Sequence, residues 1–347
     1  MAIRRPGIFH HATHVRQSRS AVRAVVGDRH ARGRLHNIRP GDAHCVTTLH
    51  ASILGLTQFT LSGAIFCYAF RLRELPGRLN VVSNMSLLRL IQFTDPHLYG
   101  SETESLRGVQ TAPALAQALA QARARHWPVD AVLVTGDIVQ DDPAGYAHFR
   151  RLFRNAGAPV LCIPGNHDDP EALRRELACD PFVVGGLMDF GPWRIVLLDT
   201  WVAGSAAGRL STQSLAQLDQ ALRTAAGRHA LVCLHHHPVS MSSHWLDEVG
   251  LENSAEFWRV IDQHRNVRAM VWGHVHQSFD QLRGDVRLLA TPSTCAQFMP
   301  GSKEFALDTL PPAYRTLQLR ADGTLTTEVV WIEQCAAGSS SSVSSAA

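Results

Sequence analysis

Short apolar runs alternate with longer amphipathic stretches along most of the chain. Five of these runs each end at a polar cluster: LLRLIQFT, DAVLVT, PVLCIP, HALVCL and VRAMVW. They are rich in Val, Leu and Ile, and they lack the polar alternation of a strand that faces water on one side. The pattern therefore predicts five buried β-strands.

The stretches between these runs are rich in strong helix formers. A first helix is expected within residues 103–126, with Pro113 in its first turn and Trp127-Pro128 at its end. Further helices are predicted over 142–157, 170–179, 211–226 and 254–264. A strand, a helix and a second strand of this length form a βαβ unit with parallel strands, so the chain is predicted to be an α/β protein.

Other segments predict antiparallel strands. Residues 187–199 predict a hairpin that turns at Gly191-Pro192. Three late segments are also predicted to be antiparallel strands: VRLLATPS, YRTLQLRADG and TLTTEVVWI. Asp322-Gly323 is a good hairpin turn between the last two.

Residues 1–84 lack this rhythm. Residues 1–50 carry nine Arg and seven His with little hydrophobic periodicity. Residues 51–70 are uncharged and long enough for a membrane anchor, although their hydroxyl groups and two glycines weaken that interpretation. We favour the alternative that Met85 is the true start and that residues 1–84 are an upstream frame read through.

We expect one domain over residues 85–334 and a disordered, serine-rich tail over 335–347. The net charge of +3 hides an asymmetry, because residues 1–84 hold twelve Arg against three acidic side chains. Removing these from the totals of 33 basic and 30 acidic residues leaves 21 and 27, a net charge of −6. The predicted domain is therefore acidic, and no nucleic-acid partner is expected.

Seven cysteines are scattered along the chain without a C-x-x-C pair, and Cys162 and Cys233 fall inside predicted buried strands. An odd number without regular spacing argues against a disulfide framework and fits a reduced compartment, so we expect a cytoplasmic protein. The polar clusters contain no cysteine, which argues against a thiolate metal site.

The five polar clusters are Asp95-Pro96-His97, Gly136-Asp137, Gly165-Asn166-His167-Asp168, His235-His236-His237 and Gly273-His274-Val275-His276. Ligand sites in open α/β sheets lie beyond the carboxyl ends of the strands, so these side chains are expected to meet at one edge. Asp, Asn and His without thiolate suit ions such as Mn, Fe or Zn. Seven ligands exceed what one tetrahedral ion needs, whereas two ions that share a carboxylate would use them all.

In this order, the motifs D-x-H, G-D, G-N-H-D, H-H before proline and G-H-x-H resemble those of the calcineurin-like metallophosphoesterase superfamily. They span residues 91–276. The resemblance implies a four-layer α/β/β/α sandwich with two mixed sheets and a binuclear site at the carboxyl ends of strands. It also implies two divalent or trivalent metal ions, of Fe, Mn or Zn.

The resemblance assigns ligands residue by residue. One ion would take Asp95, His97, Asp137 and His276. The other would take Asp137, Asn166, His235 and His274, so that Asp137 bridges the two. The groups expected to contact the substrate are His97, Asn166, His167 and His276.

One assignment depends on how the middle motif is aligned, because the family writes H-H-P-P and this chain has His235-His236-His237-Pro238. Matching Pro238 to the second proline makes His235 the ligand. His236 is the alternative, and adjacent residues at a strand end face opposite sides, so the two are not expected to share the role. His237 would support a ligand or face the substrate.

Longer stretches narrow the resemblance to the bacterial class III 3′,5′-cyclic-AMP phosphodiesterases: GDIVQDD, LHHHPVSMSSHWLDEVGLEN, WGHVHQSFD, LLATPSTCAQF and LDTLPPAYRTLQLRADGTLTTEV. This implies hydrolysis of cyclic AMP to 5′-AMP, in which a metal-bridging hydroxide attacks and the metals offset the phosphate charge. A small cyclic nucleotide is thus the expected partner. A membrane partner is expected only if residues 51–70 are an anchor.

Within this mechanism His167 would donate a proton to the departing ribose oxygen or stabilise negative charge. Asp168 would orient His167 or be a solvated turn residue. Trp245, in a predicted loop, would shape a nucleoside pocket or pack within its own loop.

Two other functions stay open. The first is a different phosphoesterase of the same superfamily, acting on monoesters, 2′,3′-cyclic nucleotides or nucleic-acid ends. The second is a scaffold that kept the fold and lost catalysis, but every expected ligand is present in the sequence.

Overall fold

The computed structural model describes residues 87–333. The expected extension over 1–84 with its possible anchor at 51–70, and the expected tail over 335–347, lie outside the described residues. Within residues 87–333, no helix has both the length and the apolar composition needed to cross a membrane.

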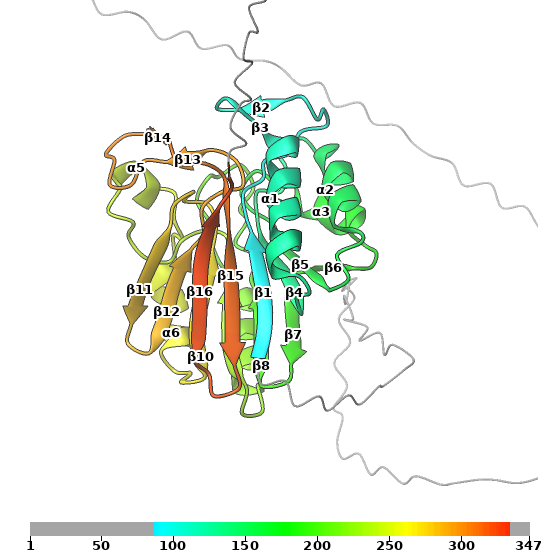
Figure 1. Ribbon diagram of the computed structural model, residues 1–347. Helices are drawn as coiled ribbons and strands as arrows, with labels where there is room; N and C mark the ends of the chain where they lie inside the picture. Colours follow the sequence, from blue (N-terminus) through cyan, green and yellow to red (C-terminus); the bar gives the residue numbers. More distant parts are fainter. Residues whose placement is uncertain (1–86, 334–347) are drawn as a thin grey trace, which may run out of the picture. The chain divides into compact units, whose positions relative to one another are not determined.

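The first sheet is built on β1 (Leu87–Phe93), which places Ile91 and Phe93 in the apolar cluster on its outer face and Leu88 and Leu90 in the cluster between the sheets. Three further parallel strands lie on one side of it: β4 and β5, which follow the predicted βαβ order, and β6, which was not predicted. On the other side, β15 and β16 add antiparallel strands. Figure 1 shows β16, β15, β1 and β4 next to one another. The six strands, in spatial order, are β16 (Leu325–Trp331), β15 (Ala313–Arg320), β1 (Leu87–Phe93), β4 (Ala131–Thr135), β5 (Val160–Ile163) and β6 (Phe182–Val184).

The second sheet has four parallel strands with an antiparallel strand at each edge. Its strands, in spatial order, are β11 (Phe279–Arg283), β12 (Val286–Ala290), β10 (Val267–Trp272), β9 (His229–Cys233), β8 (Trp193–Leu197) and β7 (Gly186–Phe190). The prediction for VRLLATPS was partly wrong, because β12 is parallel to β10 and antiparallel only to β11. The reason is β11 itself, an exposed and polar strand that gives no apolar signal.

The helices are α1 (Thr111–His126), α2 (Gly145–Phe153), α3 (Pro170–Glu176), α4 (Thr212–Arg223), α5 (His244–Asp247) and α6 (Ser254–Ile261). The first begins at Thr111, and a small hairpin of β2 (Ser105–Leu106) and β3 (Val109–Gln110) precedes it. Pro113 does lie in its first turn. The predicted loop around Trp245 contains α5, and a further short pair, β13 (Gln297–Phe298) with β14 (Leu307–Asp308), lies beyond the second sheet.

Three apolar clusters separate four layers. One packs α1, α2 and α3 against the outer face of the first sheet, and another packs α4 and α6 against the outer face of the second. The third lies between the sheets and contains residues such as Leu90, Leu133, Leu231 and Val271. The predicted α/β/β/α sandwich with two mixed sheets is therefore confirmed.

Candidate metal centre

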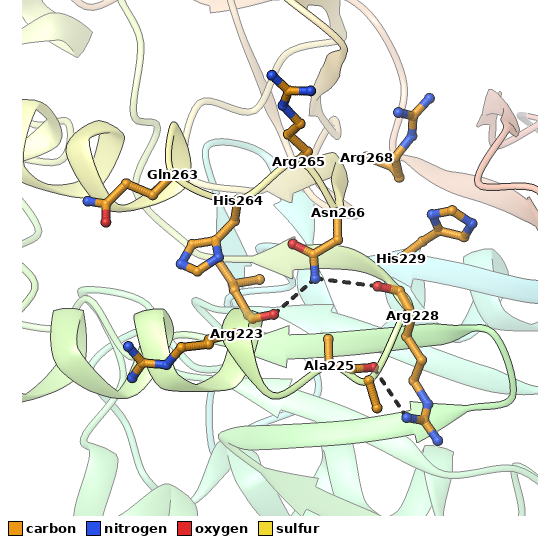
Figure 2. Close-up of a pocket in the computed structure, with 12 residues that line it drawn as sticks. Arg223, Ala225, Arg228, His229, Gln263, His264, Arg265, Asn266 and Arg268 are labelled. Atoms are coloured by element: carbon orange, nitrogen blue, oxygen red, sulfur yellow. Dashed lines mark hydrogen bonds between the residues drawn. The ribbon is translucent and has the colours of Figure 1, made fainter.

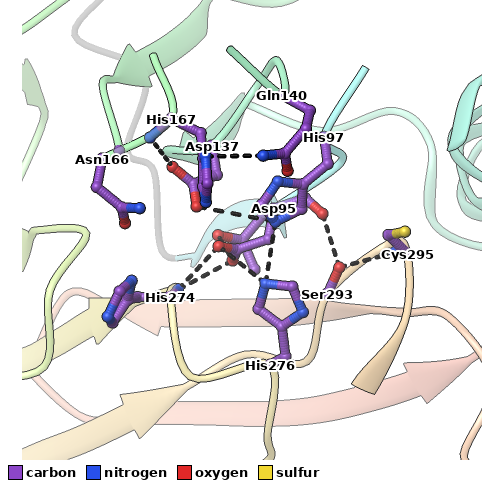
Figure 3. A network of polar contacts seen from close by, with 12 residues as sticks. Asp95, His97, Asp137, Gln140, Asn166, His167, His274, His276, Ser293 and Cys295 are labelled. Carbon is purple, nitrogen blue, oxygen red and sulfur yellow. Dashed lines mark hydrogen bonds and ion pairs between the residues drawn. The ribbon is translucent and has the colours of Figure 1, made fainter. Parts of the chain in front are cut away.

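The five polar clusters meet where strands of both sheets end, because β1, β4, β5, β9 and β10 all present their carboxyl ends at the same edge. Figure 3 shows Asp95 at the middle of the group, with histidines around it. Backbone bonds join the first two clusters: Asp95 N donates to the Gly136 carbonyl at 3.1 Å, and His97 N donates to the Asp137 carbonyl at 2.9 Å. The His274 N–H donates to both carboxylate oxygens of Asp95, each at 3.0 Å.

Several sets of three side chains have their ligand atoms close enough to hold a metal ion, all within 4.8 Å of one another. They are Asp95 with His97 and His276; Asp95 with Asp137 and His235; His97 with Asp137 and His167; and His235 with His236 and His274. Because Asp95, His97, Asp137 and His235 each occur in two sets, the sets overlap and form one continuous cluster. The six predicted Asp and His ligands are thus brought together with His167 and His236, and the seventh predicted ligand, Asn166, lies 3.2 Å from His235 Nε2 through its Oδ1.

The backbone at the cluster is strained. Left-handed φ angles occur at Asp95 (51°), His97 (49°), Asp137 (48°), His274 (67°) and His276 (49°). This conformation is uncommon for residues other than glycine, and such outliers gather at functional sites. The strain turns these side chains away from the strand axes and toward one another.

Two buried carboxylates dominate the electrostatics. Asp95 and Asp137 are 0% and 2% exposed. Burial alone would raise their pKa values, but His276 and His235 near Asp95, and His235 and His97 near Asp137, hold both pKa values below their usual range. Both carboxylates are therefore ionised at neutral pH.

The buried histidines of the cluster differ in the direction in which their pKa values are shifted. Burial would lower the pKa of His235, yet the carboxylates of Asp137 and Asp95 raise it to about 9. Burial lowers the pKa of His97 to about 4, and that of His274 well below its usual range. Neutral imidazole is the form that binds metals. A proton on His235 supplies the positive charge that an ion would otherwise bring.

The donor set fits a metal centre. A ligating histidine usually donates its other ring N–H to a carbonyl or carboxylate, which fixes the ring. His235 Nδ1 lies 2.7 Å from the Thr135 carbonyl oxygen, and His276 Nδ1 lies 2.7 Å from that of Ala296. In the part of the chain that the structure describes, the buried nitrogens His97 Nδ1 and His274 Nε2 have no hydrogen-bond partner. Oxygen and imidazole donors of this kind suit Zn, Mn or Fe.

The three consecutive histidines have different surroundings. His235 Nε2 lies 3.2 Å from Asn166 Oδ1 and 3.5 Å from Asp137 Oδ2. His236 Nδ1 lies 2.7 Å from Thr200 Oγ1, while its Nε2 has no hydrogen-bond partner among the described residues and the ring belongs to the set with His235 and His274. His237 is buried, and its ring is stacked on that of His274 with centroids 5.7 Å apart. Of the three, His235 is therefore the one that faces both the predicted bridge and the predicted amide ligand.

His167 lies at the open side of the cluster. Its side chain is 33% exposed, and its ring centroid is 5.3 Å from that of the buried His97. Its Nδ1 lies 2.8 Å from Gln140 Nε2 and 3.0 Å from Asp141 Oδ2. Neither neighbour was predicted from the sequence, although both belong to the polar run that follows G-D at 136–137.

Both predicted roles of Asp168 are wrong. Its carboxylate is 3% exposed, and it accepts hydrogen bonds from the backbone N–H groups of Gly165, Ile138 and Val139. It also accepts one from the Tyr146 hydroxyl at 2.8 Å. Asp168 therefore ties the second and third clusters together from below, and it neither contacts the His167 ring nor faces solvent.

An aromatic group borders the cluster on the side of His276. The Phe298 ring is stacked on the His276 ring, with centroids 4.0 Å apart and planes 6° apart. Trp245 and Phe305 pack edge-on against Phe298. Asp247 accepts hydrogen bonds from Ser240 and from the Met241 N–H, so it holds its own loop.

A separate pocket of about 600 Å³ lies at the amino-terminal ends of β9 and β10 (Figure 2). Its ionisable lining residues are all of the basic types: Arg223, Arg228, His229, His264, Arg265 and Arg268. Asp219 pairs with Arg223 at 3.2 Å, and Asp189 with Arg228 at 3.6 Å. The polar clusters follow the opposite ends of the same strands, so this pocket is not part of the metal centre.

Comparison with known proteins agrees with this geometry. The family model described as calcineurin-like phosphoesterase matches residues 88–278, more than half of the chain. The chain belongs to this family. Its members use a binuclear metal site, and the Asp and His sets described above supply side chains that could hold metals. The family predicted from the motifs is therefore confirmed.

Curated members of the phosphoesterase family resemble the chain over most of their length. It is 39% identical to the 3′,5′-cyclic adenosine monophosphate phosphodiesterase CpdA of Pseudomonas aeruginosa, over 69% of this chain and 88% of that protein. It is 40% identical to CpdA of Escherichia coli K12, over 70% of this chain and 89% of that protein. A dimetal phosphatase from Danio rerio has the same fold, with a TM-score of 0.50 and 17% identity, over 71% of this chain and 99% of that one.

Gly273 allows the last cluster of this phosphoesterase to approach the first. A Cβ at this position would overlap Thr94 Oγ1 and Asp95 Oδ2, and these two atoms are joined by a hydrogen bond in which Thr94 donates. We expect Gly273→Ala to weaken binding of Mn²⁺ by at least about tenfold, because Asp95 must move. Titration of the metal-free protein with Mn²⁺ measures this.

Gly157→Ala is the matched control. Gly157 has a φ of 71°, but a Cβ added there would have no atom within 4 Å. The substitution should lower stability by about 1 kcal/mol through backbone strain and leave Mn²⁺ affinity unchanged. Equal Mn²⁺ affinity in the two variants would contradict the steric argument.

Proposed function

We propose that the chain is a metal-dependent 3′,5′-cyclic-nucleotide phosphodiesterase that hydrolyses cyclic AMP to 5′-AMP. The observation that carries this proposal is the 39–40% identity to two cyclic-AMP phosphodiesterases over nearly nine tenths of their length. The clustered Asp, Asn and His side chains support it, because phosphodiester hydrolysis at neutral pH needs an activated water and compensation of phosphate charge. A phosphoesterase for other esters is the alternative.

We assign the ligands by the contacts of each side chain. Asp95, His97 and His276 would hold one ion, and Asn166, His235 and His274 the other, with Asp137 between them. When bound, two such ions lower the pKa of a water and offset the negative charge of the phosphate. Oxygen and imidazole donors without thiolate favour Fe, Mn or Zn as the pair.

His167 would act on the substrate from the open side. Its Nδ1 is held by Asp141 Oδ2 at 3.0 Å and Gln140 Nε2 at 2.8 Å, which leaves the opposite nitrogen to donate to the departing ribose oxygen. Breaking the bond from phosphorus to that oxygen leaves an alkoxide, which takes this proton. Asn166 shares the partly exposed side of the site and would orient the phosphate, whereas His97 and His276 contact it from the buried side.

The aromatic group of Trp245, Phe298 and Phe305 would accommodate the base. It lies beside His276, and Phe305 is 43% exposed, so part of its ring surface is available for stacking. We propose that residues 85–334 form the catalytic domain. Within residues 87–333 the cysteines at 162, 179, 233 and 295 are unpaired, which supports action in the reducing cytoplasm.

The direct test is a substrate panel with the metal-loaded full chain. Cyclic AMP, 2′,3′-cyclic AMP, 5′-AMP and a single-stranded oligonucleotide are compared at saturating Mn²⁺. We expect the highest kcat/KM for 3′,5′-cyclic AMP. A clear preference for the 2′,3′ isomer or for a monoester would favour the alternative phosphoesterase.

Asp137→Ala should abolish hydrolysis of cyclic AMP, because it removes the carboxylate shared by both proposed metal positions. Asp169→Ala is the matched control, since the Asp169 carboxylate only caps α3 by accepting from the N–H groups of Glu171 and Ala172. That control should cost about 1 kcal/mol of stability and keep its activity. The proposed bridge is wrong if Asp137→Ala binds metal and turns over normally.

His235→Ala should reduce bound metal and activity more than His236→Ala. The reason is that His235 Nε2 faces Asp137 and Asn166, whereas His236 is held by Thr200. Metal content after dialysis, measured by atomic emission, and kcat with cyclic AMP are the two readouts. The opposite order would make His236 the ligand.

His167→Ala should lose roughly 10²–10⁴-fold in kcat/KM on cyclic AMP, the contribution of a positioned general acid. The loss should be much smaller on bis(p-nitrophenyl) phosphate, whose phenolate leaves without a proton. Comparing the two losses at saturating metal separates proton donation from charge stabilisation. Equal losses on both substrates would leave only electrostatic stabilisation.

A further inference from the structure

A line of polar side chains crosses the layer between the two sheets, directly beneath the metal centre. It consists of Arg315, Thr291, Gln92, Thr135 and Thr94, and we call it the relay. All five residues are at most 2% exposed. Polar groups in this position carry a large desolvation cost, and the rest of the layer is apolar.

The relay is a continuous series of hydrogen bonds that ends on Asp95. Arg315 Nε lies 3.0 Å from Thr291 Oγ1, which lies 2.6 Å from Gln92 Oε1. Gln92 Nε2 lies 2.8 Å from Thr135 Oγ1. Thr135 Oγ1 lies 2.7 Å from Thr94 Oγ1, and Thr94 Oγ1 lies 2.6 Å from Asp95 Oδ2.

The arginine fixes the direction of every bond. A guanidinium can only donate, so the Thr291 hydroxyl accepts from Arg315 and gives its own proton to Gln92 Oε1. The amide group of Gln92 then donates to Thr135, which donates to Thr94. The last hydroxyl donates to Asp95 Oδ2, and a carboxylate can only accept when ionised. A buried cation is thus connected to a buried anion by donors that all point the same way.

Arg315 also links strands of the two sheets through its other hydrogen bonds. Within residues 87–333 it makes no ion pair, and its remaining bonds go to the Thr327 hydroxyl and to the carbonyl oxygens of Phe279 and Ala290. A buried charge without a carboxylate partner is strongly unfavourable. Hydrogen bonds in a dry interior polarise one another, so the charge strengthens each bond along the relay.

We propose that the relay positions Asp95 for metal binding, by holding its carboxylate in one orientation. Thr94 occupies Oδ2, and Oδ1 is left to face His276 at 3.4 Å. The relay residues are positioning residues: among their side chains only that of Thr94 bonds to a proposed ligand, while the backbone carbonyl of Thr135 also lies 2.7 Å from His235 Nδ1. The proposal rests on the metal-binding half of the proposed function and is independent of the substrate.

Thr291→Val tests the relay far from the site. Valine keeps the size of threonine but breaks the series between Arg315 and Gln92. The metal-free full chain is titrated with Mn²⁺, and free Mn²⁺ is followed by electron paramagnetic resonance. Direct partners of metal ligands typically contribute about 10–100-fold in affinity, so we expect roughly that loss for Thr94→Val and about three- to tenfold for Thr291→Val. Thr291→Ser, which keeps the hydroxyl, should restore the affinity.

Thr327→Val is the matched control. Its hydroxyl also accepts from Arg315, at 3.1 Å, but it lies on a side branch that does not lead to Asp95. We expect the melting temperature of the metal-free protein to fall in both valine variants and the Mn²⁺ affinity to fall only in Thr291→Val. If Thr291→Val loses stability and binds Mn²⁺ as the unaltered chain does, the relay is only a link between the sheets and the proposal is wrong.

A double variant tests whether the five residues act as one unit. A break at any link removes the polarisation of the rest, so Thr135→Val with Thr291→Val should lose no more affinity than Thr135→Val alone. Additive losses would overturn the relay. If the unaltered chain binds no Mn²⁺, Asp95 has no metal to hold and both proposals fail. If it binds Mn²⁺ without hydrolysing cyclic AMP, only the proposed function fails.

Discussion

The carboxylates of Asp95 and Asp137 are ionised yet almost completely removed from water, and the surrounding structure has to stabilise that state. An uncompensated charge in such a place costs several kcal/mol, on the order estimated for buried ions in general. Compensation comes from backbone N–H groups, since His274 N donates to Asp95 and His167 N donates to Asp137 at 2.9 Å. It also comes from His235, whose pKa of about 9 makes it a cation in the absence of metal. The two buried carboxylates therefore need a positive charge beside them, and a metal cation can supply that charge in place of the proton on His235.

The same constraint explains why strained backbone collects at this edge. Five of the proposed ligands adopt left-handed φ angles, each costing on the order of 1–3 kcal/mol. In a regular strand Asp95 and His97, two residues apart, would point to the same face but lie about 6.6 Å apart along the strand, so their ligand atoms would not converge on one point together with those of Asp137. The strands beneath offset that cost, since every residue of β4 and β5 is buried. The buried strands therefore supply the stability that allows strained backbone at the residues following their carboxyl ends.

Much of the fold and of the site could be predicted because both depend on local signals. Buried strands appear as apolar runs, and ligands as polar clusters that directly follow them, so β1, β4, β5, β9 and β10 were placed correctly. The exposed strand β11 has no apolar run, and its absence from the prediction gave β12 the wrong neighbour. The role of Asp168 depends on Tyr146 and on backbone groups of another loop, which no spacing along the chain reveals.

The layer between the sheets changes character along the strands. Its inward-facing positions on β1 run from Leu88 and Leu90 to Gln92, and then to Thr94 beyond the strand end. The apolar half binds the two sheets together, and the polar half supports the ligands from the buried side. The opposite side of the cluster is open, since His167 is one third exposed and Asp141 two thirds. Ions would thus be held from within while the substrate enters from solvent, so firm metal binding and rapid exchange of the nucleotide can share one edge of the fold.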